Sequence, residues 1–192
     1  MDSFNENKAV GQLAEIVALE RGYAPAKARQ IRIAGFLHDI GKQRIVSSII
    51  DKPGTLTARE FEIIKTHTKL GAAMLLSIQG ELGEMARACC ELHHEWHDGS
   101  QSYWGHRAAD LPAYIGIVSI CDVFTALCST RCYKKPWPPD DALEYIQNKA
   151  GTQFCPELAG VFIPLVQKDS RVPAIFTGIQ AQNNNTQRRE ST

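Results

Sequence analysis

The feature that most constrains this chain is a His-Asp pair at the end of an apolar helical stretch, Ile33-Ala-Gly-Phe-Leu-His38-Asp39. Imidazole and carboxylate groups beside a buried helix are costly to desolvate unless they have a partner. A hydrogen bond between the two side chains would satisfy them, and this is the more common explanation for an isolated pair. A metal ion is the alternative, because it takes an imidazole nitrogen and a carboxylate oxygen together.

Two residues just after the pair refine this picture. Gly41 predicts the end of the helix, because glycine tolerates a positive φ angle. Lys42 places a point charge beside the pair, and an ammonium group suits a phosphate oxygen.

Further candidate ligands lie on other apolar helical stretches. His67 is on a helix predicted to start at a capping box, Thr57-Ala-Arg-Glu60, and a lone histidine on a helix is more often structural than a ligand. His93 and His94 end an apolar helix predicted over residues 81–94. Two histidines there could bind one metal, or could simply be favoured by the helix dipole at a solvated helix end.

Asp122 is an acidic residue within an otherwise apolar helical stretch. A buried carboxylate needs a counter-charge, which could be a metal ion or a basic side chain such as Arg131. A set of imidazole and carboxylate ligands suits iron, manganese, nickel or zinc better than magnesium or calcium.

The periodicity predicts helices and no sheet, so the expected fold class is all-α. Helices are predicted over residues 8–22, from Pro25 to the His-Asp pair, from Thr57 through His67, over 81–94, from a cap at Asp110, over 140–149 and over 156–168. One domain is expected over residues 1–168, followed by a polar tail, 169–192, that we expect to be disordered.

Composition excludes several function classes. The 192-residue chain has a formal net charge of +0, which gives no argument for DNA binding. No apolar run approaches the roughly 18 residues that span a bilayer, so membrane insertion is not expected. The six cysteines form no C-x-x-C pair and the N-terminus lacks a signal-peptide pattern, so we expect a cytoplasmic protein with reduced thiols.

Six short motifs occur in one order along the chain. They are His38-Asp-Ile-Gly-Lys42, Lys52-Pro-Gly-Thr-Leu-Thr57, Ile64-Lys-Thr-His67, His93-His-Glu-x-x-Asp98-Gly99, Asp122-Val-Phe-x-Ala-Leu127 and Arg131-x-Tyr-Lys134. This series, over about residues 8 to 165, resembles the HD-GYP subfamily of the HD-domain metal-dependent phosphohydrolases. The resemblance implies an HD-domain helical bundle with a two- or three-metal centre. Characterised members hydrolyse cyclic di-GMP, often under the control of fused sensory domains.

The resemblance also assigns roles to residues. Asp39 would bridge two divalent transition metals, most readily iron or manganese, with nickel or zinc as alternatives. The first metal would take His38 and Asp122, and the second would take His67, His93 and His94. Lys42, Tyr103 and Arg131 would contact the substrate.

The chain departs from the family pattern at three places. Glu6 or Asn7 stands where the family has a metal-binding histidine, and Glu6 could replace it as a carboxylate ligand. Thr125 stands at the position of a second acid. The Gly-Tyr-Pro signature is replaced by Gly99-Ser-Gln-Ser-Tyr103-Trp104-Gly105, which leaves the cyclic di-GMP specificity open.

The leading hypothesis is a metal-dependent phosphodiesterase of the cyclic di-GMP type that uses a metal-activated hydroxide. Two alternatives stay open: a phosphohydrolase acting on another nucleotide, and a non-catalytic module that binds a nucleotide or a partner. These 192 residues leave no room for an added sensory domain of ordinary size. The chain therefore acts alone, is one piece of a longer protein, or is controlled by a separate regulatory protein or through a homodimer, and the sequence leaves these alternatives open.

Overall fold

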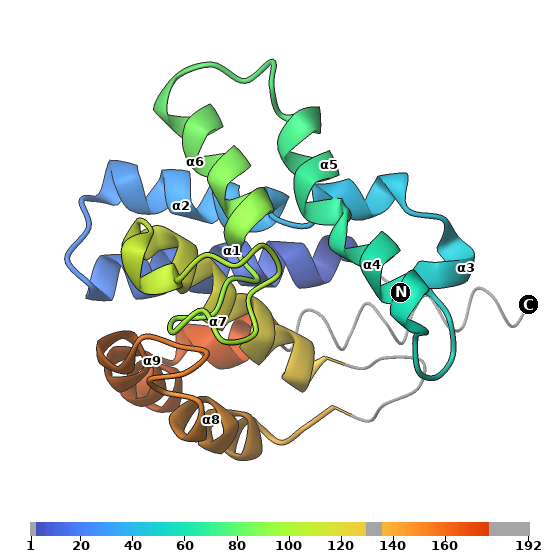
Figure 1. Cartoon of the computed structure of the whole chain (residues 1–192). Coiled ribbons are helices and arrows are strands. Elements are labelled where there is room, and N and C mark those ends of the chain that lie inside the picture. Colours follow the sequence, from blue (N-terminus) through green and yellow to red (C-terminus); the bar gives the residue numbers. More distant parts are fainter. Residues whose placement is uncertain (1–2, 130–135, 177–192) are drawn as a thin grey trace, which may run out of the picture.

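The computed structural model describes residues 3–129 and 136–176, and this part of the chain is a bundle of helices (Figure 1). The helices are α1 (Ser3–Glu20), α2 (Pro25–Leu37), η1 (Ile40–Arg44), α3 (Ser47–Ile50), α4 (Ala58–Lys65), α5 (His67–Met74), α6 (Gly80–Leu92), η2 (Ala108–Asp110), α7 (Ala113–Cys128), α8 (Pro139–Asn148) and α9 (Pro156–Lys168). The described residues form no strand beyond one isolated bridge between Ala150 and Phe154. The predicted all-α class is confirmed.

The helices α1 and α2 run antiparallel and form one side of the bundle (Figure 1). The helix α6 packs against α2, and α5 packs against α6 and η1. The apolar helix α7 packs against α1, and α8 and α9 close the other end. Buried side chains from α1, α2, α6, α7 and α9 make one continuous core, including Leu13, Ile31, Met85, Phe124 and Phe162. This core fixes the helix ends that carry the candidate ligands.

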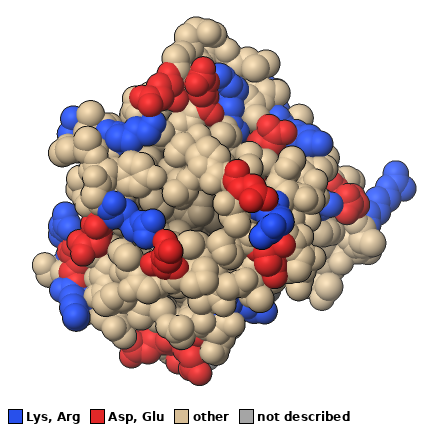
Figure 2. All heavy atoms as spheres, turned by 60° about the vertical axis from the view of Figure 1, so that its left-hand side comes forward, with Lys and Arg blue, Asp and Glu red and all other residues tan. Residues whose placement is uncertain are grey.

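The surface and the cysteines agree with the composition. Lysine, arginine and acidic side chains are interspersed over the face in Figure 2, without a surface of one sign. No helix within the described ranges is long and apolar enough to cross a membrane. Five cysteines are free: Cys89, Cys90, Cys121, Cys128 and Cys155. Cys132 lies outside the described residues.

The capping box at Thr57 is confirmed, but the helix after it is two helices rather than one. The backbone N–H of Glu60 donates to Thr57 Oγ1 at 3.2 Å, and the N–H of Thr57 donates to Glu60 Oε2 at 2.7 Å. The break falls at Thr66, where its hydroxyl donates to the carbonyl of Ile63 at 2.6 Å. Side chains that bond to the preceding turn bend a helix, and they turn α5 away from α4.

The predicted cap at Asp110 is wrong. Asp110 lies in the short helix η2, and α7 begins after Pro112 without a side-chain cap. The fixed φ angle of Pro112 already prepares the entry into α7.

The predicted boundary of the tail is also wrong. Residues 171–176 are helical, and Val172 is buried because it joins the core. The packed region therefore extends at least to residue 176, and the rest of the predicted tail lies outside the described residues.

Gly41 has a different role from the predicted one. Its φ angle is not positive, and the chain continues beyond it as η1. A Cβ atom at Gly41 would lie 1.9 Å from the carbonyl oxygen of His67 and 2.5 Å from the backbone nitrogen of Gly71. Glycine is therefore needed here because the backbones of η1 and α5 touch.

We expect Gly41→Ala to lower the free energy of unfolding by about 1 to 3 kcal/mol or more, because the added methyl group would separate η1 from α5. Urea unfolding followed by circular dichroism would measure this change. Gly160→Ala on α9 is the matched control, since a Cβ atom there meets nothing within 4 Å. Equal stability of the two variants would contradict the packing argument.

Candidate metal centre

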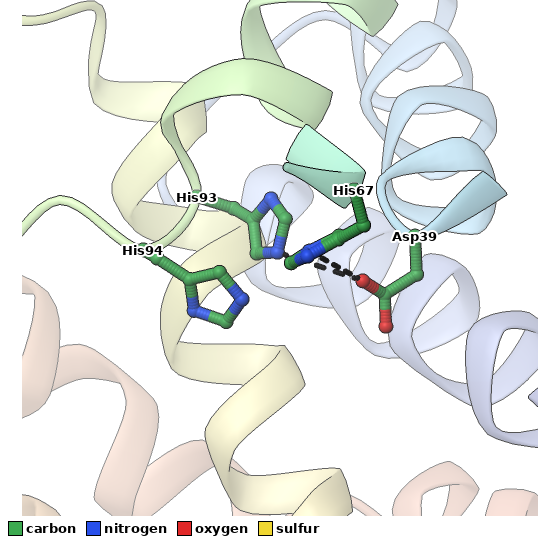
Figure 3. Close-up of side chains that lie close together, drawn as sticks. All are labelled: Asp39, His67, His93 and His94. Atoms are coloured by element: carbon green, nitrogen blue, oxygen red, sulfur yellow. Dashed lines mark ion pairs between the residues drawn. The ribbon is translucent and has the colours of Figure 1, made fainter. Parts of the chain in front are cut away.

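Three segments bring their polar side chains to one point. Asp39 follows α2, His67 begins α5, and His93 and His94 follow α6 (Figure 3). Their ligand atoms lie within 4.8 Å of one another. His67 Nε2 lies 3.1 Å from Asp39 Oδ1, and His93 Nε2 lies 3.7 Å from the same oxygen.

A second group adjoins the first. It consists of His38, His93 and Asp122, whose ligand atoms also lie within 4.8 Å of one another. His38 Nε2 lies 3.3 Å from Asp122 Oδ1 and 3.4 Å from Asp39 Oδ2. Asp39 and His93 lie where the two groups meet. The structure thus brings together six predicted ligands: His38, Asp39, His67, His93, His94 and Asp122.

Backbone carbonyls orient three of the imidazole rings. The Nδ1 atom of His38 lies 2.6 Å from the carbonyl of Gly35, and that of His67 lies 2.5 Å from the carbonyl of Ile64. His93 Nδ1 lies 2.8 Å from the carbonyl of Cys89. A carbonyl only accepts, so each Nδ1 carries a proton and donates, and in the neutral ring each Nε2 presents a lone pair.

The opposite atoms of these rings have no such partner. The Nε2 atoms of His38, His67 and His93 and the Oδ1 atom of Asp39 are buried and make no hydrogen bond within the described residues. Buried polar atoms are almost always hydrogen-bonded, so four converging exceptions need an explanation. Divalent cations held by the two groups of ligand atoms would satisfy them, and carbonyl-anchored imidazoles are the usual ligand geometry. These residues therefore fit a metal.

Burial and neighbouring charges keep the imidazoles of His93 and His94 neutral beside an ionised Asp39. Burial, with a smaller effect of the neighbouring His94, holds the pKa of His93 well below its usual value, and burial lowers the pKa of His94 to about 4. Burial opposes ionisation of Asp39, but Lys42 and His38 hold the pKa of this carboxyl group well below its usual range.

His38 behaves differently from the other histidines in the metal-free chain. Burial opposes its protonation, but Asp39 and Asp122 outweigh burial and raise the pKa of His38 to about 10. A proton on this imidazole therefore occupies the position that a cation would take between the two carboxylates.

The predicted substrate residues have different outcomes. Lys42 Nζ contacts Asp39 Oδ2, so its charge lies at the centre. The Tyr103 ring lies 4.4 Å from the His94 ring at an angle of 30°. Burial, helped by the charges of Asp122 and Asp39, raises the pKa of Tyr103 to about 12. Arg131 lies outside the described residues.

Glu6 lies in the first turn of α1 and belongs to neither group of ligand atoms. Its role as a replacement ligand stays a prediction.

A sequence model described as an HD domain matches residues 2–158. The chain belongs to the HD domain family. The predicted family is thereby confirmed, and the match covers every clustered ligand named above.

Curated members of the family are similar over most of this chain. A cyclic di-GMP phosphodiesterase of Thermotoga maritima is 34% identical over 165 residues, covering 86% of this chain and 45% of the relative. The response regulator RpfG of Xanthomonas campestris, a cyclic di-GMP phosphodiesterase, is 35% identical and covers 77% of this chain and 39% of its own. A 3′3′-cGAMP-specific phosphodiesterase of Vibrio cholerae is 35% identical, covering 74% and 27%. This chain thus spans less than half of each relative.

Two solved structures share the fold. One, titled a HDG"Y"P protein from Bdellovibrio bacteriovorus, has a TM-score of 0.69 at 15% identity and covers 86% of this chain and 52% of its own. The other is the HD domain of the L. monocytogenes phosphodiesterase PgpH in complex with cyclic-di-AMP, with a TM-score of 0.58 at 20% identity, covering 85% and 89%. At these identities the likeness concerns the fold.

Glu95 is a residue of the site that the sequence reasoning missed. It is 1% exposed, and its two oxygens accept the backbone N–H groups of Trp104 at 2.9 Å and of His106 at 2.7 Å. It follows His94 directly, so one carboxylate ties the loop with Tyr103 to the metal centre. The available signal was an acidic residue between a histidine pair and a loop rich in aromatic residues.

We expect Glu95→Gln to lose one of these two hydrogen bonds, because a side-chain amide has only one acceptor oxygen. The free energy of unfolding should fall by about 1 to 3 kcal/mol, and the amides of Trp104 and His106 should exchange hydrogen faster. Amide exchange followed by NMR would measure both effects. Glu84→Gln, at an exposed position of α6, is the control and should leave them unchanged. Unaltered exchange in Glu95→Gln would contradict the role.

The pKa values also predict how the metal-free protein responds to acid. The pKa of His94 falls from 6.5 to about 4 on folding, so the unfolded chain binds more protons between these values. The free energy of unfolding should therefore decrease as the pH falls from about 6.5 toward about 4. Urea unfolding in EDTA across this range would measure the slope. His94→Asn should flatten it, and an equal slope in both proteins would refute the assignment.

Proposed function

We propose that this chain is a metal-dependent phosphodiesterase that hydrolyses a cyclic dinucleotide, with cyclic di-GMP as the first candidate. The observation that carries the proposal is the convergence of three buried imidazole Nε2 atoms on the Asp39 carboxylate, none of them hydrogen-bonded within the described residues. The names of the curated relatives support the substrate class, since they include phosphodiesterases for cyclic di-GMP and for 3′3′-cGAMP.

In this proposal the chain holds two divalent transition metals, most readily iron or manganese. His67, His93 and His94 would hold one, His38 and Asp122 would hold the other, and Asp39 would bridge them. Metals held in this way supply Lewis-acid charge that polarises water and a phosphoryl oxygen. Imidazole and carboxylate ligands together favour such metals over magnesium or calcium.

The residues around the metals have separate tasks. Lys42 lies against Asp39 and would stabilise the negative charge that develops on the phosphoryl oxygens. Tyr103 covers His94 and would contact the substrate next to the scissile phosphate. No serine or cysteine nucleophile would be required, because metals held by these residues would supply an activated water as the nucleophile.

Location and regulation stay predictions. Free cysteines, three of them buried, support the proposed cytoplasmic location. Control by a separate protein or through a homodimer is likewise a proposal, and size-exclusion chromatography with light scattering would test the homodimer.

We expect Asp39→Ala to lower kcat for cyclic di-GMP by about 100-fold or more, because the bridging carboxylate and its contact with Lys42 are both lost. Anaerobic purification followed by elemental mass spectrometry would give the metal content of each sample. Asp51→Ala, at an exposed acidic residue, is the control and should keep full activity. Full turnover by Asp39→Ala at equal metal content would refute the proposal.

A further inference from the structure

A strip of aromatic and lysine side chains runs outward from the metal centre. We call it the aromatic–lysine strip, and it consists of Phe61 and Lys65 on α4, Lys69 on α5, and Tyr103 and Trp104 in the loop after α6. The rings of Phe61 and Tyr103 meet edge to face at 5.7 Å. Lys65 Nζ lies 5.6 Å from the Tyr103 ring centre and 5.2 Å from that of Trp104, and Lys69 Nζ lies 3.6 Å from the Trp104 ring centre.

The strip is attached to the metal centre at two points. The Tyr103 ring lies against the ring of His94 at 4.4 Å. The indole N–H of Trp104 donates to Thr68 Oγ1 at 3.1 Å, and Thr68 is the neighbour of the candidate ligand His67. The strip is therefore contiguous with the residues of the metal centre.

The two lysines bring positive charge to this place. Lys65 is 16% exposed and pairs at 3.3 Å with Glu62, an acid that is itself 65% exposed, so this pair is screened by solvent and weak. Lys69 is exposed and makes no ion pair with a carboxylate of the described residues. Lys42 differs, because its ammonium group contacts Asp39 within the centre. The strip thus carries cationic charge that the metal centre does not use.

We infer that the aromatic–lysine strip binds the uncleaved half of a dinucleotide substrate. The inference rests on the proposed function, in which one phosphate lies on the metals. A cyclic dinucleotide has a second phosphate, which needs a cation of its own, and Lys65 and Lys69 supply one.

The aromatic rings of the strip suit the nucleobase of the uncleaved half. Nucleobases stack on aromatic side chains, and Phe61 presents an exposed ring beside Tyr103. Trp104, which replaces the proline of the related signature, is held in place by Thr68 and Lys69. The loop residues that differ from the family signature therefore form part of the proposed binding surface.

Two measurements on the metal-loaded protein test this inference. The first is the Kd of a non-hydrolysable phosphorothioate analogue of cyclic di-GMP, which has two phosphates. The second is the hydrolysis of bis(p-nitrophenyl) phosphate, which has one. In the double variant Lys65→Gln and Lys69→Gln, we expect the Kd to rise by about tenfold or more, because charge-assisted contacts are lost. Hydrolysis of the one-phosphate ester should change less than about twofold, since Lys42 and the ligands remain.

Lys149→Gln is the matched control, because Lys149 also lies over a tryptophan ring, 5.5 Å from the centre of Trp96. It should alter neither measurement. An unchanged Kd in the double variant would overturn the inference, and so would a parallel loss of both binding and hydrolysis. If the unaltered protein hydrolyses neither cyclic di-GMP nor bis(p-nitrophenyl) phosphate at full metal content, the proposed function fails, and the Kd comparison still decides the role of the strip.

Discussion

The site depends on the hydrogen bonds that fix the histidine rings to the main chain. The last carbonyls of a helix have no partner within the helix, and they need a donor. His38 and His93 lie just beyond helix ends and donate from Nδ1 to carbonyls of the preceding turn, at Gly35 and Cys89. His67 does the same at the break between α4 and α5. The same contacts that end these helices aim the Nε2 lone pairs at one point.

This arrangement restricts the packing around it. The segment after Asp39 must approach α5 closely enough for the carboxylate to reach His67, and a side chain at Gly41 would prevent it. Close backbone contact then holds the two ligands together, while the apolar core behind α6 and α7 fixes the remaining ones. The cost of gathering buried polar atoms is met by the packing of the whole bundle and by the cation that the site fits.

The ligand set could be predicted from the sequence because each ligand stands at the end of an apolar run or within one. The assignment of His67 and Asp122 as ligands depended on the other motifs, because each residue alone has an ordinary structural explanation. The start at Thr57 was predictable because a capping box is local. The break at Thr66 and the burial of Val172 were not, because they depend on side-chain bonding to the preceding turn and on contacts with distant helices.

Glu95 and the aromatic–lysine strip were missed for a similar reason. Their partners lie on a loop whose path no periodicity describes, and the strip joins α4, α5 and that loop across long separations in sequence. Glu6 shows the opposite case, because its proposed role came from a family position and the two groups of ligand atoms do not include it.

The loop from Trp96 to His106 is closed upon itself. The N–H of Trp96 donates to Ser102 Oγ, and that hydroxyl donates to the carbonyl of His106. The carbonyl of Trp96 accepts the N–H of Ala108, so both ends of the loop are stapled at its base. These contacts fix the base of the loop close to His93 and His94. In the proposed function, this loop is the part of the chain through which substrate preference diverges, while the ligand residues stay the same.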